Sequence, residues 1–186
     1  MSAGHLVLAL GIVGALALTA RIPRSSNVRE SLAHVRNSFE FLVHAPQNLV
    51  APLFGAHRER VWAEGWDPQF IYPQPAEDRP GAVFTINHGG HTSTWITTAL
   101  DLERGQVQYA YFIPGAMTTL IDIHLSPAGA SGTHVEVVYE RTALSSEVND
   151  HVTKMGEQDR SSADHWQKAI EKYLVNEKDG LKEIKR

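Results

Sequence analysis

A carboxylate stands out in the C-terminal part of the chain, where apolar residues recur at helical spacing. Asp159 falls in register with Met155 and Trp166, where a helix packed on a core would carry an apolar side chain. A carboxylate that faces an apolar pocket costs several kcal/mol unless it is paired or neutralised. Asp159 is therefore a candidate to contact a ligand hydroxyl or to act as a base. The alternative is that it is solvated or bonded to a strand side chain.

Histidine is the second residue type that could carry chemistry, with 10 in the chain. His88 alternates with Phe84 and Ile86, which makes it the first candidate for a polar group inside a cavity. Gly-Gly separates His88 from His91, so two imidazoles could approach one ion. A further group on predicted neighbouring strands consists of Asp122, His124, His134 and Glu136. Zinc or iron needs three or more converging ligands, which neither group establishes, so we predict no metal and no cofactor.

Aromatic residues are spread over the predicted strands, and tyrosine combines an apolar ring with a polar tip that can orient a ligand. They are interpreted as core or as pocket lining. With the helical candidates, the predicted ligand-binding residues are Tyr72, Phe84, His88, Trp95, Tyr109, Tyr111, Tyr139, Met155, Asp159 and Trp166.

Composition and motifs exclude several other kinds of chemistry. The chain has 186 residues, no cysteine and a net charge of -4, which removes thiolate nucleophiles and gives no basic footprint for nucleic acid. The Gly-x-Ser-x-Gly motif, the phosphate loop and the dinucleotide fingerprint are absent from the sequence. The length suits one domain with a sizeable core.

The N-terminus differs from the rest of the chain, because residues 6–20 are almost all apolar. A helix of that length reaches roughly 22 Å, short of the ~30 Å hydrocarbon core, which fits a signal peptide. No Lys or Arg precedes the segment, and Arg21, Arg24 and Arg29 follow it, which favours a membrane anchor. The domain is then exported (periplasmic or extracellular) or membrane-anchored, with a cytoplasmic protein and a misassigned start as alternatives. The predicted divisions are 1–24 apolar segment, 25–37 linker, 38–176 domain and 177–186 charged tail.

The candidate residues lie on elements that read as a strand, two short helices, a run of strands and a long helix. The Ala45-Pro46 dipeptide ends the first strand and opens the helix pair. Sequential strands joined by short turns favour an antiparallel sheet. The predicted strands are 39–44, 69–72, 82–88, 92–102, 106–113, 118–125 and 133–142, and the helix is 149–176. The sheet would wrap around this helix, and we expect an unfilled cavity between them.

This order of elements resembles the START/Bet v 1-like (SRPBCC) helix-grip superfamily, including its polyketide-cyclase-like members. The resemblance covers residues 38–175 and rests on fold-level features. These features are the segments 39–46, 62–66, 109–115, 132–139 and 166–174, together with Trp95. The superfamily has no shared catalytic motif, so the resemblance implies no active-site residue. It implies an α+β helix-grip fold with an interior pocket for an apolar or amphipathic small molecule.

The predicted function is therefore binding or transport of a hydrophobic or amphipathic, lipid- or polyketide-like molecule in an internal cavity. One alternative is a cyclase, aromatase or dehydratase in which Asp159 or His88 acts as acid–base. The other is a non-catalytic interaction module whose interior is filled by side chains and whose convex sheet face docks a partner. Membrane association through residues 6–20 is a further expectation, and the oligomeric state stays open.

Overall fold

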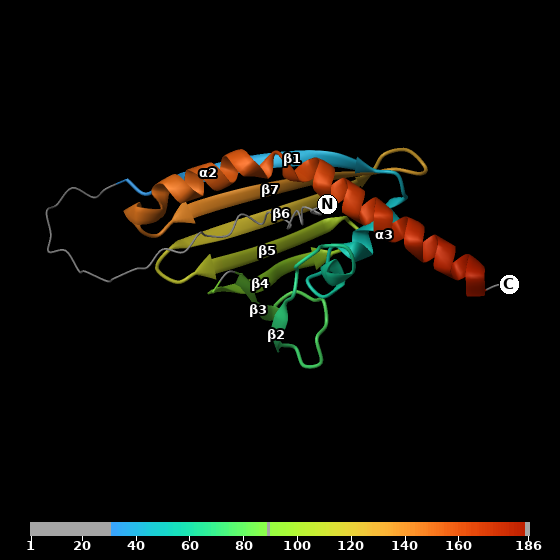
Figure 1. The fold of residues 1–186 in the computed structure, drawn as a ribbon, viewed down its shortest axis with the longest axis horizontal. Helices are drawn as coiled ribbons and strands as arrows, with labels where there is room; N and C mark the ends of the chain where they lie inside the picture. Colours follow the sequence, from blue (N-terminus) through green and yellow to red (C-terminus); the bar gives the residue numbers. More distant parts are fainter. Residues whose placement is uncertain (1–30, 89, 185–186) are drawn as a thin grey trace, which may run out of the picture.

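A single antiparallel sheet forms most of the molecule. The computed structural model describes the backbone of residues 31–88 and 90–184, and the side chains of this range except those of 88 and 178–184. The seven strands are β1 (His34–Val43), β2 (Gln69–Tyr72), β3 (Val83–His88), β4 (His91–Asp101), β5 (Gln106–Ile113), β6 (Met117–Pro127) and β7 (Thr133–Ala143). They lie in the order β1-β7-β6-β5-β4-β3-β2 (Figure 1). As the short turns predicted, each strand after β2 pairs antiparallel with the strand before it. The first strand, β1, pairs with the last, β7.

Helices cover one face of this sheet. The short ones between β1 and β2 are α1 (Gln47–Val50), η1 (Ala51–Leu53) and η2 (Arg58–Val61), and those after β7 are η3 (Ser146–Val148), α2 (Asn149–Asp159) and α3 (Ser162–Ile184). Figure 1 shows α2 and the first part of α3 along β1 and β7, while the rest of α3 runs past the end of the sheet. The predicted helix-grip architecture is confirmed.

The alternation along each strand decides which side chains enter the core. On β7, Val135, Val137 and Tyr139 point inward and are buried, while the alternating residues His134 and Glu136 are half-buried on the outer face. The helix side of the core centres on Trp166 of α3. Its ring makes edge contacts with Phe39 of β1 at 5.5 Å and with Trp62 at 5.4 Å between centroids. The contact between the sheet and α3 therefore consists largely of aromatic rings.

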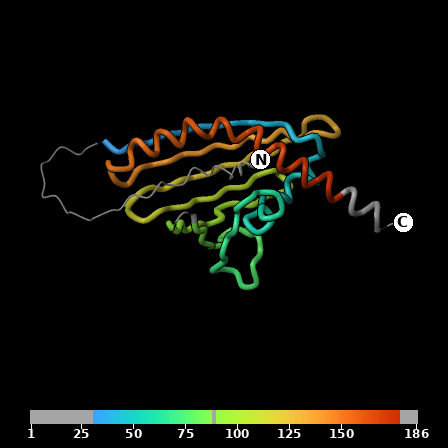
Figure 2. The backbone as a smooth tube through the Cα atoms, in the orientation of Figure 1, coloured from blue at the N-terminus to red at the C-terminus, as the bar shows by residue number. Residues whose placement is uncertain are grey.

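Three differences from the sequence predictions go beyond shifts of one or two residues at the ends of strands. The strand β1 begins at His34, inside the stretch predicted as a linker, and α3 continues to Ile184 through most of the predicted tail. The single helix predicted over 149–176 is two helices, separated at Arg160 and Ser161 (Figure 2). The hydroxyl of Ser161 donates to the Gln158 carbonyl oxygen at 2.7 Å, and the backbone N–H of Ser161 donates to the same oxygen at 3.0 Å. This local bonding replaces the helical i→i−4 pattern and ends α2.

None of the helices in the described residues is both long and apolar enough to cross a membrane. The apolar segment 6–20 lies outside the described residues.

Candidate functional site

The carboxylate of Asp159 is held by an arginine on the sheet. Arg141 of β7 donates from both terminal nitrogens to Asp159 at the end of α2, with 3.0 Å between Nη2 and Oδ1. Both side chains are buried, with 3% and 8% of their surfaces exposed. The guanidinium also lies 4.2 Å from the ring centroid of Tyr139, a cation–π arrangement. The structure thus realises the alternative in which Asp159 is bonded to a strand side chain.

A second buried carboxyl, Glu59 of η2, was not a sequence candidate. The hydroxyl of Tyr109 on β5 lies 3.1 Å from Glu59 Oε1 and 3.2 Å from the Phe54 carbonyl oxygen. Burial raises the pKa of Glu59 to about 8, the charge of Asp78 adds to this, and the bond to Tyr109 opposes it. At neutral pH the carboxyl is mostly protonated. It can then donate to Tyr109, which in turn donates to the Phe54 carbonyl.

The only sequence signal for Glu59 is its spacing. It precedes Trp62 by three residues and Trp66 by seven, so a helical reading of this segment places all three on one face. The segment is short and irregular in composition, and η2 spans only Arg58–Val61. Helical periodicity is not measurable over one turn, which is why the sequence did not single Glu59 out.

Glu59 lies in the lining of a small aromatic cavity between sheet and helix. The lining consists of Glu59, Ile121, Ile123 and the six aromatic residues Trp62, Trp66, Trp95, Tyr109, Tyr139 and Trp166. The free volume is about 10 Å³, room for about one water molecule. The expected unfilled hollow is therefore wrong for this conformation. All four tryptophans of the chain point into the space that the curved sheet leaves, and their rings fill it.

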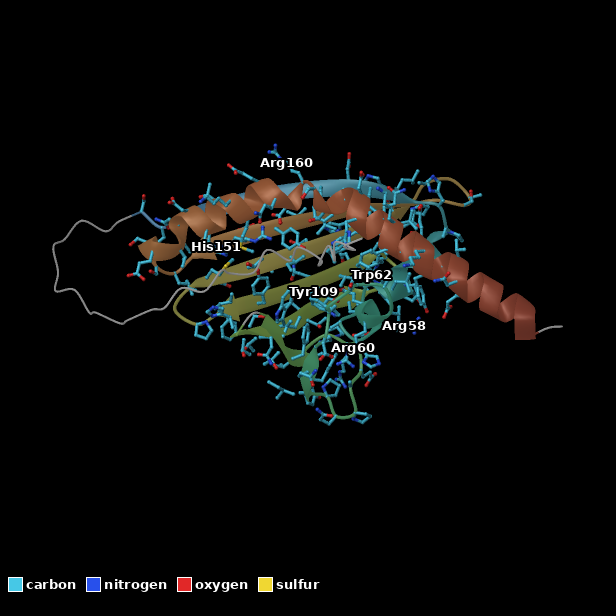
Figure 3. All side chains as sticks on the ribbon, viewed as in Figure 1. Arg58, Arg60, Trp62, Tyr109, His151 and Arg160 are labelled. Carbon is cyan, nitrogen blue, oxygen red and sulfur yellow. The ribbon has the colours of Figure 1, made fainter. Side chains whose placement is uncertain are left out.

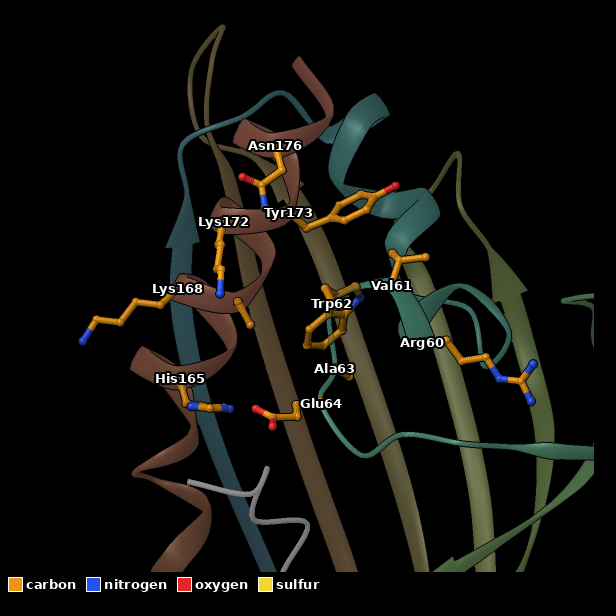
Figure 4. Close-up of a pocket in the computed structure, with 11 residues that line it drawn as sticks. Arg60, Val61, Trp62, Ala63, Glu64, His165, Lys168, Lys172, Tyr173 and Asn176 are labelled. Carbon is orange, nitrogen blue, oxygen red and sulfur yellow. The ribbon is translucent and has the colours of Figure 1, made fainter. Parts of the chain in front are cut away.

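A larger groove of about 420 Å³ opens on the surface between the η2 segment and α3 (Figure 4). Trp62 lies in it between the two elements, and Lys172 lines it on the α3 side. At the lower end, His165 and Glu64 point toward one another. Arg60 belongs to the lining but turns aside, with its guanidinium 3.2 Å from the Asp67 carboxylate.

Trp62 is the residue that lines both the groove and the aromatic cavity. Figure 3 shows it with Tyr109 over the face of the sheet that the helices cover. Its indole N–H donates to the Leu53 carbonyl at 2.8 Å, and the residue is 7% exposed. The indole N–H of Trp66 likewise donates to a backbone carbonyl, that of Ala56, at 2.7 Å. Trp66 lines the cavity but not the groove. A single ring therefore separates the groove from the interior.

Four sequence-predicted residues come together around this interior. Trp95, Tyr109, Tyr139 and Trp166 line the cavity. Two more pack directly behind them, since the rings of Tyr111 and Phe84 stack on Trp95 with centroids 4.2 Å and 5.8 Å away. The strand alternation was sufficient to place these aromatic side chains inward.

The remaining candidates lie elsewhere. Met155 packs in a separate apolar cluster with Met117 and Val152. Tyr72 does not line the interior: it is 51% exposed on the edge strand β2, with Arg79 over its ring at 5.7 Å. The backbone of His88 ends β3, and its side chain lies outside the described part. Among the described residues, no group of three or more His, Asp or Glu side chains is placed to hold a metal ion.

Solved structures with the same arrangement of elements establish the fold. Norcoclaurine synthase from Thalictrum flavum aligns with a TM-score of 0.59 at 15% identity, over 88% of this chain and 99% of the synthase. The chain has the START/Bet v 1-like helix-grip fold. The protein Ara h 8.0201 aligns with a TM-score of 0.58 at 14% identity, covering 77% of this chain and 99% of its own. A protein from Rhizobium leguminosarum aligns at 0.55 and 13% identity, over 78% and 97% of the two chains.

No protein-family model matches the chain, and no curated protein matches it by sequence. At the identities above, the helix-grip likeness concerns the fold and not the activity.

Proposed function

We propose that the protein binds an apolar or amphipathic small molecule in the aromatic interior of the helix-grip fold, with the groove between η2 and α3 as the route inward. The observation that carries this proposal is the position of Trp62. It is the side chain that lies between a groove of about 420 Å³ and a buried aromatic cavity whose lining includes one glutamate and two tyrosines. Apolar walls with a few convergent polar groups are typical of small-molecule sites.

The interior has to open before it can accept a ligand, because its free volume is about 10 Å³. Displacing Trp62 breaks one hydrogen bond, to Leu53, together with the edge contact with Trp166 and the tilted contact with Phe54. A hydrogen bond of this kind contributes about 0.5–1.5 kcal/mol, and the apolar body of a ligand would replace the ring contacts. Of the other lining residues, six lie on strands or on α3, which keep that part of the site in place, while Glu59 and Trp66 belong to the same segment as Trp62.

The test is uptake of a neutral apolar fluorophore, N-phenyl-1-naphthylamine, followed by stopped-flow fluorescence. We expect saturable binding of one probe per protein. Trp62→Phe keeps an aromatic ring but loses the bond to Leu53, so uptake should accelerate about two- to tenfold. Trp66→Phe is the matched control: it loses the equivalent bond to Ala56, but Trp66 does not line the groove, so the uptake rate should stay unchanged.

Two results would contradict the proposal. Equal acceleration by Trp62→Phe and Trp66→Phe would mean that loosening of the core, and not a route past Trp62, sets the rate. Absence of saturable uptake in wild type would mean that the interior stays filled.

The second result would support a different function, which the small free volume of the interior also favours. In that case the helix-grip domain is an interaction module that docks a partner on the convex face of its sheet. The enzyme alternative loses one of its two candidate groups, because Asp159 is bonded to Arg141.

A further inference from the structure

We propose that the interior site takes an organic ammonium ion, with the carboxylate of Glu59 as its counter-ion and the surrounding aromatic rings as its walls. This inference rests on the proposed function, because the ammonium group can reach Glu59 only if the interior opens past Trp62.

The charges around the cavity support a cationic ligand. Glu59 is the one carboxyl in the lining, and within the described part of the chain no Lys, Arg or His lines this cavity. Arg141, which lies over the Tyr139 ring, is not part of the lining and is bonded to Asp159. A carboxyl placed among aromatic rings is the arrangement that binds alkylammonium groups, since the faces of Trp and Tyr rings attract a cation. The net charge of -4 also favours the approach of a cation over that of an anion.

Packing and local hydrogen bonding do not by themselves require an acid at position 59. The Tyr109 hydroxyl has a second acceptor in the Phe54 carbonyl, so it would remain bonded without Glu59. A buried carboxyl without a cationic partner is unfavourable for folding. An ammonium ligand would supply that partner.

The proton balance predicts in which direction the affinity for an ammonium ion changes with pH. In the empty protein Glu59 holds a proton at neutral pH, because burial raises its pKa to about 8. When an ammonium ion binds, the O–H bond of Glu59 breaks and the proton leaves to solvent, while the ligand keeps its own charge. Affinity should therefore rise with pH up to about 8. A neutral ligand that hydrogen-bonds to the protonated acid would show the opposite trend. The other groups that face Glu59 are Tyr109, Tyr139 and Asp78.

The experiment is isothermal titration calorimetry with three ligands of similar shape: 2-phenylethylammonium, 2-phenylethanol and 3-phenylpropanoate. Each is measured against wild type at about pH 6.5 and about pH 8.5, in buffers of different ionisation enthalpy, so that proton release is counted. The variants are Glu59→Gln, which keeps the shape and the hydrogen-bonding capacity, and Glu157→Gln. The second is a matched control, because Glu157 is exposed on α2 and lines neither the groove nor the interior.

We expect the ammonium ligand to bind wild type about tenfold more tightly than the alcohol at the higher pH, to release protons, and to weaken at the lower pH. Glu59→Gln should weaken it about tenfold and abolish the proton release, and Glu157→Gln should leave affinity within about twofold. The inference is overturned if the alcohol or the carboxylate binds as tightly, if Glu59→Gln has no effect, or if none of the three ligands binds while N-phenyl-1-naphthylamine does. Failure of that neutral fluorophore as well would overturn the proposed function itself.

Discussion

Glu59 links the protonation state of the interior to the stability of the fold. Its pKa rises from 4.5 to about 8 on folding, so between these values the folded protein holds a proton that the unfolded chain does not. The resulting contribution is fully present below about pH 4.5 and is lost as the pH rises to about 8. It amounts to roughly 3–5 kcal/mol, since one pKa unit corresponds to about 1.4 kcal/mol.

The variant Glu59→Gln isolates this contribution, because Gln stays neutral at every pH. The free energy of unfolding of wild type, measured against that of Glu59→Gln by urea denaturation, should fall by several kcal/mol between about pH 5 and about pH 8.5. Other titrating groups cancel in the difference, and Glu64→Gln should show no such trend. Parallel stability curves for wild type and Glu59→Gln would show that Glu59 is ionised in the folded protein.

Asp159 and Arg141 form a buried ion pair. Judged by its helical register alone, Asp159→Asn should leave folding nearly intact. The structure reverses this expectation, because the substitution would leave the Arg141 guanidinium buried without a counter-charge. We predict a loss of about 3–5 kcal/mol of stability by denaturant unfolding. Asp164→Asn, an exposed change at the start of α3, is the control and should stay within about 0.5 kcal/mol.

A double replacement distinguishes loss of a pair from loss of packing. Arg141→Met combined with Asp159→Leu removes both charges while retaining apolar volume, and should recover most of the stability that Asp159→Asn loses. If the double variant is less stable than Asp159→Asn, the ion pair is not the reason for the effect.

Sequence reasoning worked for residues whose neighbours share a periodic element and failed for those whose partners come from elsewhere. The register of α2 correctly marked Asp159 as an inward carboxylate. Its partner, Arg141, lies 18 residues away on β7, and no local pattern connects the two. Glu59 becomes notable only through contact with Tyr109, 50 residues further along.

At the scale of elements, α3 is held on the sheet chiefly by Trp166. The residue is 7% exposed, and its ring packs against Phe39, Phe41, Phe54 and Trp62. Trp166→Ala should destabilise the protein by about 3–5 kcal/mol. The control on the same helix is Val175→Ala, because Val175 is 55% exposed. Thermal melts of both variants provide the measurement. If Trp166→Ala melts within a degree of wild type, α3 does not depend on this ring.

The division of the predicted helix into α2 and α3 shows what periodicity alone misses. Apolar residues keep the same register across the break, since Met155 and Trp166 both face inward. The break itself comes from the hydroxyl of Ser161 bonding back to Gln158, a local competition that a repeat of apolar positions does not record. The antiparallel sheet was easier to predict, because Gly and Pro turns punctuate its strands.

At the scale of the whole molecule, the sequence predicts the curved sheet around a helix but not how full its interior is. Whether a gap of this kind is hollow depends on the rotamers of a few large rings that arrive from separate elements. Here Trp62 and Trp66 come from the segment around η2, Trp95 from β4 and Trp166 from α3. Their positions along the chain carry no information about whether they meet.

The central claim is that Trp62 moves aside and the interior takes up a small molecule. Fluorine NMR of protein labelled with 5-fluorotryptophan tests it directly, since the chain has four tryptophans and all of them line the cavity. Each resonance is assigned by a Trp→Phe variant. On saturation with N-phenyl-1-naphthylamine, the Trp62 resonance should move toward the position of a solvent-exposed indole, and those of Trp66, Trp95 and Trp166 should shift as the probe ring enters. Four resonances unchanged at saturation would contradict the account, because the probe would then bind outside the aromatic interior.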